Sequence, residues 1–291
     1  MKDINIFCFG FGPVAKTFID RINLESFNIN LSTTTRSKTF RKTFKEIKYQ
    51  NYLFDMSKYD KNLIPKLKEA DHILISIPPV AGEDIVVKLF SKFINNSKVK
   101  WITYLSATNV YGDHKGEWVD ENSETKPTSD KGTARLNAEK SWLSLKINNN
   151  LPIQIFRLSG IYSNENNILT RLKAGTAKLV DKNDRYFSRI HIEDIGNVLF
   201  ESLSKFKSGE IYNLSDDKPT SSKEITLYGS KLLNIQNIEK ISIDEIESKT
   251  LKDFYKDSKK VSNKKIKVFF GYTFKYPTYI EGLNYIRDNF I

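Results

Sequence analysis

The fold of this chain is decided close to its start, where residues 4–15 read Ile4-Asn5-Ile6-Phe7-Cys8-Phe9-Gly10-Phe11-Gly12-Pro13-Val14-Ala15. The first half is apolar and predicts a buried strand, and the second half follows at once with the spacing Gly-x-Gly-x-x-Ala. Gly10 permits a tight turn, Gly12 has no Cβ to keep a phosphate away from the backbone, and the small Ala15 lets the next helix pack closely. Free N–H groups at the start of that helix attract a diphosphate. We therefore predict that a dinucleotide binds at Gly10, Phe11, Gly12, Pro13, Val14 and Ala15.

Strand and helix signals continue to alternate over residues 1–163. Nearly all-apolar strand candidates follow at residues 72–77, 99–105 and 153–158. This alternation predicts an α/β Rossmann fold, a doubly wound parallel sheet covered by helices on both faces. The rhythm loosens after residue 163, so we expect residues 164–291 to form mainly a small C-terminal substrate lobe. Residues 185–215 are predicted to return to the Rossmann sheet.

The segment after the second strand candidate, residues 27–31, bears on the choice of cofactor. An NAD-binding protein usually places a carboxylate there to accept hydrogen bonds from the ribose. This chain instead offers hydroxyl groups and Arg36, which suit the 2′-phosphate of NADP. We predict NADP as the cofactor, held by Thr35, Arg36 and Ser37, with NAD as the less favoured alternative. A basic helix is expected to follow over residues 39–47.

A second candidate contact to the cofactor lies at the end of the strand expected over residues 72–77. Ile77 and Pro78 lie where such a strand reaches the crevice beside the first strand, so their backbone groups are predicted to contact the cofactor. The alternative is that the proline only ends the strand.

Composition narrows the function classes further. The 291 residues carry a formal net charge of +11, but the basic residues are scattered, with modest clusters at 36–42 and 259–267. Such clusters are usually solvated, so we expect no nucleic-acid partner. Cys8 is the single cysteine, which excludes an internal disulfide, and no His, Cys and carboxylate set has metal-ligand spacing. With no signal-peptide pattern and no apolar run of membrane-spanning length, we expect a cytoplasmic protein with a small-molecule substrate.

Four later segments carry a family resemblance. They are Ser106-Ala107-Thr108-Asn109-Val110-Tyr111-Gly112-Asp113, Arg157-Leu158-Ser159-Gly160-Ile161-Tyr162, Ser188-Arg189-Ile190-His191-Ile192-Glu193-Asp194-Ile195 and Ile211-Tyr212-Asn213-Leu214. In this order they resemble the extended short-chain dehydrogenases/reductases, the group that contains the NAD(P)-dependent nucleotide-sugar epimerases and dehydratases. The glycine spacing is more similar to that of the atypical members. The resemblance extends over nearly the whole chain, and many such relatives dimerise through the helices here predicted at 83–94 and 132–146.

The resemblance also shows a departure from the usual active site. The family uses a Ser or Thr, a Tyr and a Lys, and the matching positions here hold Ala107, Lys131 and Arg135. A guanidinium cannot relay protons, although Arg135 could still position a ribose hydroxyl of the cofactor. Lys131 can move a proton only where its surroundings favour the neutral amine.

Three other residues near this site are candidates for contact with a substrate. Thr108 or Ser106 could hold a substrate oxygen. Tyr111 is the nearest phenol in the sequence, and it could either contact the substrate or pack as a buried ring. No tyrosine occurs between Tyr111 and Tyr162 to replace the missing one.

Two functions follow from these residues. The first is an NADP(H)-dependent oxidoreductase or epimerase-like enzyme with a non-standard active site, acting on a small polar substrate, with sugar nucleotides among the candidates. The alternative is a catalytically inactive NADP(H)-binding sensor or scaffold protein that keeps the dinucleotide site and lacks the proton relay. A shared fold alone does not decide between them.

Overall fold

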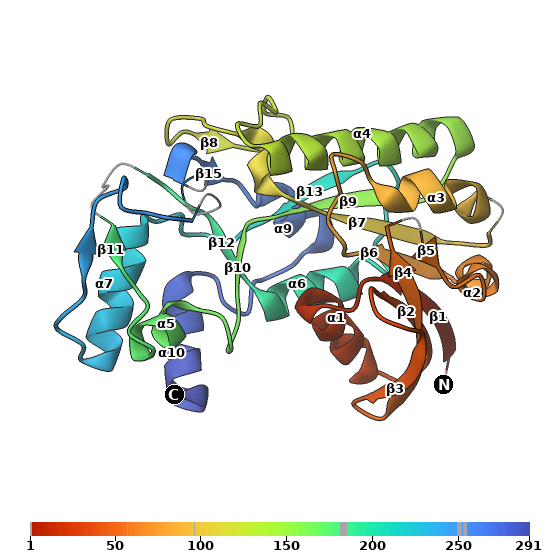
Figure 1. Cartoon of the computed structure of the whole chain (residues 1–291), viewed down its shortest axis with the longest axis horizontal. Helices are drawn as coiled ribbons and strands as arrows, with labels where there is room; N and C mark the ends of the chain where they lie inside the picture. The colour runs from red at the N-terminus through yellow and green to blue at the C-terminus, as the bar shows by residue number, and fades with distance from the viewer. Residues whose placement is uncertain (1, 57, 96, 181–184, 249–251, 253–254) are drawn as a thin grey trace. The chain divides into compact units, whose positions relative to one another are not determined.

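The predicted strands form a mostly parallel sheet in the computed structural model, which describes residues 2–56, 58–95, 97–180, 185–248, 252 and 255–291. Its strands lie in the order β13-β9-β7-β6-β1-β2-β4-β3 (Figure 1). Their bounds are β1 Lys2–Phe9, β2 Phe27–Thr35, β3 Phe40–Phe44, β4 Ile47–Asp55, β6 His72–Ile75, β7 Trp101–Ala107, β9 Ile153–Leu158 and β13 Ile211–Leu214. The order reverses at β1, which pairs in parallel with both β2 and β6. This is the predicted Rossmann fold, and ligands of such sheets bind at the reversal point.

Helices cover both faces of this sheet (Figure 1). One face is covered by α2, α3 and α4, and the other by α1 and α6. The helices are α1 Pro13–Asn23, α2 Leu63–Glu69, α3 Ile85–Ile94, α4 Asp130–Asn149 and α6 Ile192–Glu201. Alternate residues of β1 face opposite sides, so Phe7 and Phe9 pack in the cluster that contains Phe90 of α3 and Trp142 of α4. On the other face, Phe18 of α1 stacks on Trp101.

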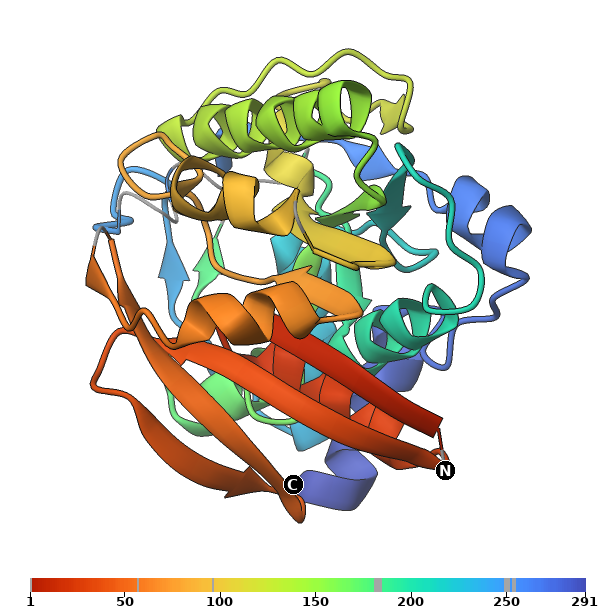
Figure 2. The ribbon, with the colours of Figure 1, turned by 90° about the vertical axis from the view of Figure 1, so that its right-hand side faces the viewer.

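The helix predicted over residues 39–47 is wrong. Residues 40–44 form β3, which pairs antiparallel with β4 at the outer edge of the sheet, as Figure 2 shows. The two strands are joined by Lys45 and Glu46, whose φ angles are 44° and 70°. A two-residue hairpin turn needs positive φ at both positions, and Asn-Gly is its usual sequence signal. Lys-Glu gives no such signal, and the spacing of Phe40, Phe44 and Ile47 also fits one face of a helix.

Two compact units make up the chain. The first consists of the residues up to Ala107, Thr133–Arg157 and Ile195–Tyr212, and the second of Thr108–Gly132, Leu158–Asp194 and Asn213–Ile291. In the second unit the short strands pair in parallel as β10 with β12, β11 with β14, and β8 with β15.

The elements of the second unit are short, and helices supply its core. Their bounds are η1 Thr108–Tyr111, β8 Trp118–Val119, β10 Gly160–Tyr162, α5 Ile168–Lys173, β11 Leu179–Val180, β12 Arg189–His191, α7 Ser222–Leu233, β14 Lys240–Ile241, β15 Lys260–Val261, α9 Lys264–Phe270 and α10 Tyr279–Phe290. Leu169 of α5, Ile225 of α7 and Leu283 of α10 belong to one buried cluster. In the described part of the chain, no helix has both the length and the apolar character needed to cross a membrane.

A buried ion pair fixes α4 against β9 inside the first unit. The guanidinium of Arg157 lies 2.7 Å from the carboxylate of Glu139, and the two side chains are only 4% and 2% exposed. The Ser106 hydroxyl donates to the same carboxylate at 2.5 Å. Glu139 therefore holds two residues that come from neighbouring strands.

Removing this carboxylate should destabilise the fold strongly. We expect Glu139→Ala to lower the free energy of unfolding by roughly 3–5 kcal/mol, because it leaves the Arg157 charge buried without its partner. Urea denaturation measures the loss. The matched control is Glu69→Ala, which breaks the Lys66–Glu69 pair on α2, whose side chains are 50% and 60% exposed. That change should stay within about 1 kcal/mol, and equal losses for the two variants would contradict the assignment.

Candidate functional site

A cavity of ≈ 860 Å³ lies in the first unit, where the carboxyl ends of β1, β2 and β4 meet the segment that follows β6. Eight of the residues predicted to bind the cofactor line it, namely Gly10, Phe11, Gly12, Thr35, Arg36, Ser37, Ile77 and Pro78. Three separate stretches of chain that the sequence singled out thus line one cavity.

Gly10 holds the strand ends of this cavity together. Its φ is +85°, and a Cβ built there would lie 2.7 Å from Cγ2 of Ile77 and 2.9 Å from Oγ of Ser76. Its N–H donates to the Thr34 hydroxyl at 2.8 Å, and the Ser76 hydroxyl donates to the Phe9 carbonyl at 3.0 Å. Only glycine fits a turn that is this close to the end of β6.

Gly12 presents the opposite situation. A Cβ at this position would meet no atom of the described chain within 4 Å. Gly12 precedes the first turn of α1, no side chain caps that end of the helix in the described structure, and Pro13 occupies the first helical turn. Backbone N–H groups at an uncapped helix start bind phosphate, and a bare glycine lets the phosphate approach. These residues fit the diphosphate of a dinucleotide.

Cationic side chains outnumber carboxylates among the described residues that line the cavity. Arg36 is joined by Lys16 of α1 and by Lys42 of β3, and Asp55 supplies a carboxylate. The hydroxyls of Thr35 and Ser37 lie 3.0 Å apart. This set of donors suits an anionic ligand with hydroxyl groups.

Sequence reasoning missed the lining residues that β3 and β4 contribute. They are Phe40, Lys42, Tyr49, Asn51, Phe54 and Asp55. Those on β3 were hidden by the helix predicted there. Asp55 ends a strand that neighbours β2 in the sheet. Its place at the carboxyl end of that strand could have indicated that it faces the ligand site.

Four predicted cofactor residues do not line this cavity. Ala15 is fully buried. This agrees with the expectation that its small side chain lets α1 pack closely. Pro13 and Val14 lie beside it in the first turn of α1. The guanidinium of Arg135 donates to the Leu105 carbonyl at 2.8 Å.

A second, smaller cavity of ≈ 230 Å³ lies within the second unit. It is lined by Thr108, Asn109, Ser129, Lys131, Gly160, Tyr186, Phe187, Ser188, Asp257, Lys259 and Val261. Two predicted catalytic residues, Thr108 and Lys131, are thus brought together. Their closeness depends on Gly132, because a Cβ there would lie 2.8 Å from the Asn109 carbonyl oxygen.

The other two predicted catalytic residues face elsewhere. Ser106 belongs to the first unit and is 2% exposed, with its hydroxyl on Glu139. Tyr111 is fully buried, and its hydroxyl donates to the Asn213 side chain at 2.8 Å. Tyr111 therefore packs as a buried ring, which is one of the two roles that the sequence left open for it.

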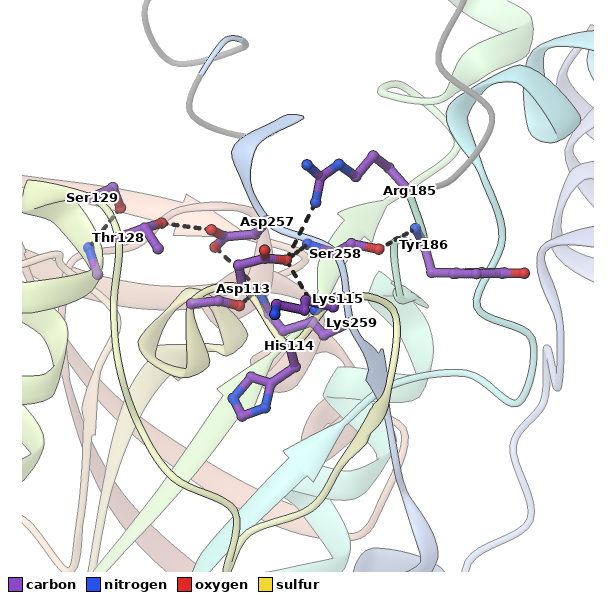
Figure 3. A network of polar contacts seen from close by, with 12 residues as sticks. Asp113, His114, Lys115, Thr128, Ser129, Arg185, Tyr186, Asp257, Ser258 and Lys259 are labelled. Carbon is purple, nitrogen blue, oxygen red and sulfur yellow. Dashed lines mark hydrogen bonds and ion pairs between the residues drawn. The ribbon is translucent and has the colours of Figure 1, made fainter.

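Lys259 also lines this cavity, and sequence reasoning did not predict it. Its ammonium donates to the Gly112 carbonyl at 2.9 Å. It also pairs with the Asp257 carboxylate at 3.2 Å (Figure 3). The Thr128 hydroxyl donates to the other oxygen of that carboxylate at 2.5 Å. Burial lowers the pKa of the Lys259 ammonium from its ordinary value, although the Asp257 charge acts in the opposite direction.

The local chain path explains why Lys259 takes this position. Asp113 accepts the Ser258 backbone N–H at 2.8 Å, and it also pairs with Arg185 at 3.3 Å (Figure 3). The strand β15 continues from there and pairs with β8. In the sequence, residues 259–267 read only as a basic and solvated run. Elsewhere in the described chain, no group of three or more His, Cys, Asp or Glu side chains is placed to hold a metal ion.

Comparison with known proteins identifies similar folds. No protein-family model matches the sequence, and no curated protein sequence matches it. A solved structure of a functionally unknown conserved protein from Silicibacter pomeroyi DSS is 28% identical, covers 99% of both chains and has a TM-score of 0.85. UDP-glucuronic acid 4-epimerase from Bacillus cereus, in complex with UDP-glucuronic acid and NAD, is 15% identical, with 99% of this chain and 98% of that chain covered and a TM-score of 0.78.

A dehydratase shows the same likeness. dTDP-glucose 4,6-dehydratase from Bacillus anthracis, in complex with NAD, is 18% identical over 99% of this chain and 96% of that chain, with a TM-score of 0.74. The chain therefore has the fold of the epimerases and dehydratases that its sequence motifs resemble.

The two glycines at the first cavity should respond differently to the same substitution. We expect Gly12→Ala to leave the free energy of unfolding within about 0.5 kcal/mol, because its Cβ enters open space. The same change should weaken NADPH binding by about tenfold or more, or at least about 1.4 kcal/mol. Gly10→Ala should instead destabilise the fold by roughly 1–3 kcal/mol through its clash with Ile77. Fluorescence titration with NADPH and thermal unfolding measure the two effects, and full NADPH affinity in Gly12→Ala would contradict the site.

Proposed function

We propose that this chain is an NADP(H)-dependent oxidoreductase or epimerase-like enzyme that acts on a small polar substrate, with sugar nucleotides among the candidates. The observation that carries the proposal is the cavity at Gly10, Gly12 and Arg36, which offers helix N–H groups and cations at the reversal point of a Rossmann sheet. Solved epimerases and dehydratases of the same fold are in complex with NAD, which supports a nicotinamide dinucleotide here.

Residues of the first unit would hold the cofactor. The backbone around Gly12 would receive the diphosphate, and Ile77 and Pro78 would contact the cofactor through their backbone. Arg36, with Lys42 nearby in the same lining, would pair with the 2′-phosphate that distinguishes NADP from NAD. When bound, the nicotinamide group supplies or accepts a hydride.

Residues of the second cavity would handle the substrate. Thr108 and Lys131 line this cavity together. Thr108 would hold a substrate oxygen through its hydroxyl, and Lys131 would exchange a proton with that oxygen. Lys131 stands where the resembling family has its tyrosine, so an amine replaces a phenol at that position. This active site is non-standard because Ala107 and Arg135 occupy the remaining two positions.

Cofactor choice gives a direct test of the Arg36 assignment. We expect Arg36→Ala to weaken NADP⁺ binding about ten- to a hundredfold, because one charge-assisted contact contributes about 1.5–3 kcal/mol. NAD⁺ binding should stay the same, since NAD⁺ lacks the 2′-phosphate. Calorimetric titrations with both nucleotides measure the preference, and the control is Arg41→Ala, which removes an arginine of β3 that lies outside the cavity lining. An unchanged NADP⁺ preference in Arg36→Ala would remove that residue from the phosphate site.

Turnover tests the enzymatic function itself. Purified protein with NADPH and a panel of carbonyl compounds and nucleotide sugars should show either a change in NADPH absorbance or a new sugar product on chromatography. Lys131→Ala should lower kcat by about 10²–10⁴ because it removes the proton-exchanging group, while NADPH binding stays intact. The control is Lys140→Ala, an exposed lysine on the same helix. Tight NADPH binding without turnover over the whole panel would favour the inactive sensor or scaffold.

A further inference from the structure

The hairpin of β3 and β4, at the outer edge of the sheet (Figure 2), forms one wall of the first cavity. Strand pairing places Phe40 opposite Asn51. Two positions further along β3 it places Lys42 opposite Tyr49. Alternate residues of a strand face opposite sides of a sheet, so these four side chains share one face. All four line the cavity, and Lys42 is the cation among them.

The ring of Phe11 connects this hairpin to the glycine turn. Phe11 is the middle residue of the Gly-x-Gly stretch that precedes α1. The centre of its ring lies 5.4 Å from that of Phe44 on β3 and 5.0 Å from that of Tyr49 on β4. Tilted and edge-on contacts between aromatic rings at this spacing are favourable. The turn proposed to receive the diphosphate thus contacts both strands of the hairpin through one side chain.

The helix α1 holds the tip of the same hairpin. The Lys45 ammonium pairs with the Asp20 carboxylate at 2.6 Å, and the Asn23 side chain donates to the Lys45 carbonyl at 3.5 Å. Residues other than glycine rarely adopt the positive φ angles of Lys45 and Glu46, so these contacts help to keep the tip in place. Both side chains of the ion pair are partly exposed, 56% and 31%, and such pairs add little. We therefore assign most of the attachment to the aromatic rings.

We infer that the β3–β4 hairpin selects the cofactor and that Phe11 is the residue that positions it. The inference rests on the proposed function, because it takes the first cavity as the dinucleotide site, and it deepens that function by naming how the site selects NADP. Lys42 would join Arg36 at the 2′-phosphate. Phe11 would fix the place of Lys42 without touching that phosphate. Binding of the diphosphate at the turn and of the 2′-phosphate at the hairpin would then be coupled.

Affinities for NADP⁺ and NAD⁺ test the role of the hairpin, and their ratio is the measured quantity. Lys42→Met should weaken NADP⁺ binding about tenfold. NAD⁺ binding should stay the same, because NAD⁺ has no 2′-phosphate. The matched control is Lys48→Met, which removes the same charge from an exposed position of β4 outside this cavity lining. Calorimetric titration of the full chain gives the affinities, and thermal unfolding checks that each variant folds.

Replacing Phe11 tests the positioning role. Phe11→Ala should lower the preference for NADP⁺ over NAD⁺ about tenfold, although it removes no charge. Phe11→Tyr keeps the ring and should keep the preference. A merely structural role for Phe11 predicts a different result, because a less stable fold weakens the binding of both nucleotides equally and leaves the ratio unchanged.

A double variant measures the coupling. If Phe11 acts through Lys42, the variant that combines Phe11→Ala with Lys42→Met should lose about tenfold in preference, no more than Lys42→Met alone. Independent effects would instead multiply to about a hundredfold, because unconnected free-energy changes add.

Three results would overturn the inference while the proposed function stands. They are an unchanged NADP⁺ to NAD⁺ ratio in Lys42→Met, an unchanged ratio in folded Phe11→Ala, and a multiplied loss in the double variant. Equal affinity of the wild-type chain for both nucleotides would also overturn it, since nothing would then be selected. Binding of neither nucleotide by the wild-type chain is a distinct result, which would contradict the dinucleotide-dependent function together with the inference.

Discussion

The proposed cofactor site depends on how closely a diphosphate can approach the backbone N–H groups at the start of α1. Gly12 makes this approach possible because a side chain there would fill the open space beside the helix. Gly10 makes it possible in another way, since its positive φ directs the chain from β1 into the helix within a very short turn. The rest of the first unit supports this geometry by burying β1 at the reversal point of the sheet.

Local patterns predicted this part of the molecule well. The run from Ile4 to Ala15 contains strand, turn and helix start in direct succession, so tertiary contacts were not needed to interpret it. The β3–β4 hairpin is the opposite case, because its turn is formed by Lys45 and Glu46 in a conformation that these residues rarely adopt. Without a turn signal, the spacing of the phenylalanines favoured a helix.

The candidate substrate site was predictable only in part, for a physical reason. Thr108 and Lys131 came from a family resemblance. Lys259 instead depends on the Gly112 carbonyl and on Asp257, whose carboxylate accepts from Thr128. Both Gly112 and Thr128 lie more than a hundred positions earlier in the chain. No local pattern marks a lysine that will be buried. Ser106 shows the same limit. It is only two residues from Thr108, yet it belongs to the first unit and donates to the buried Glu139 carboxylate of that unit. The position that the resembling family gives to tyrosine holds an amine, so the proposed proton exchange would rely on amines and hydroxyls.

Hydrogen–deuterium exchange at single-residue resolution, with and without saturating NADPH, tests the central claim most directly. The backbone N–H groups of Gly12, Val14 and Ala15, and those of residues 35–37, should exchange more slowly when NADPH is bound, because phosphate oxygens accept hydrogen bonds from them. NADH should protect the first segment and leave the second unchanged. Unaltered exchange at Gly12, Val14 and Ala15 with every pyridine nucleotide, oxidised or reduced, would contradict a dinucleotide site at the start of α1.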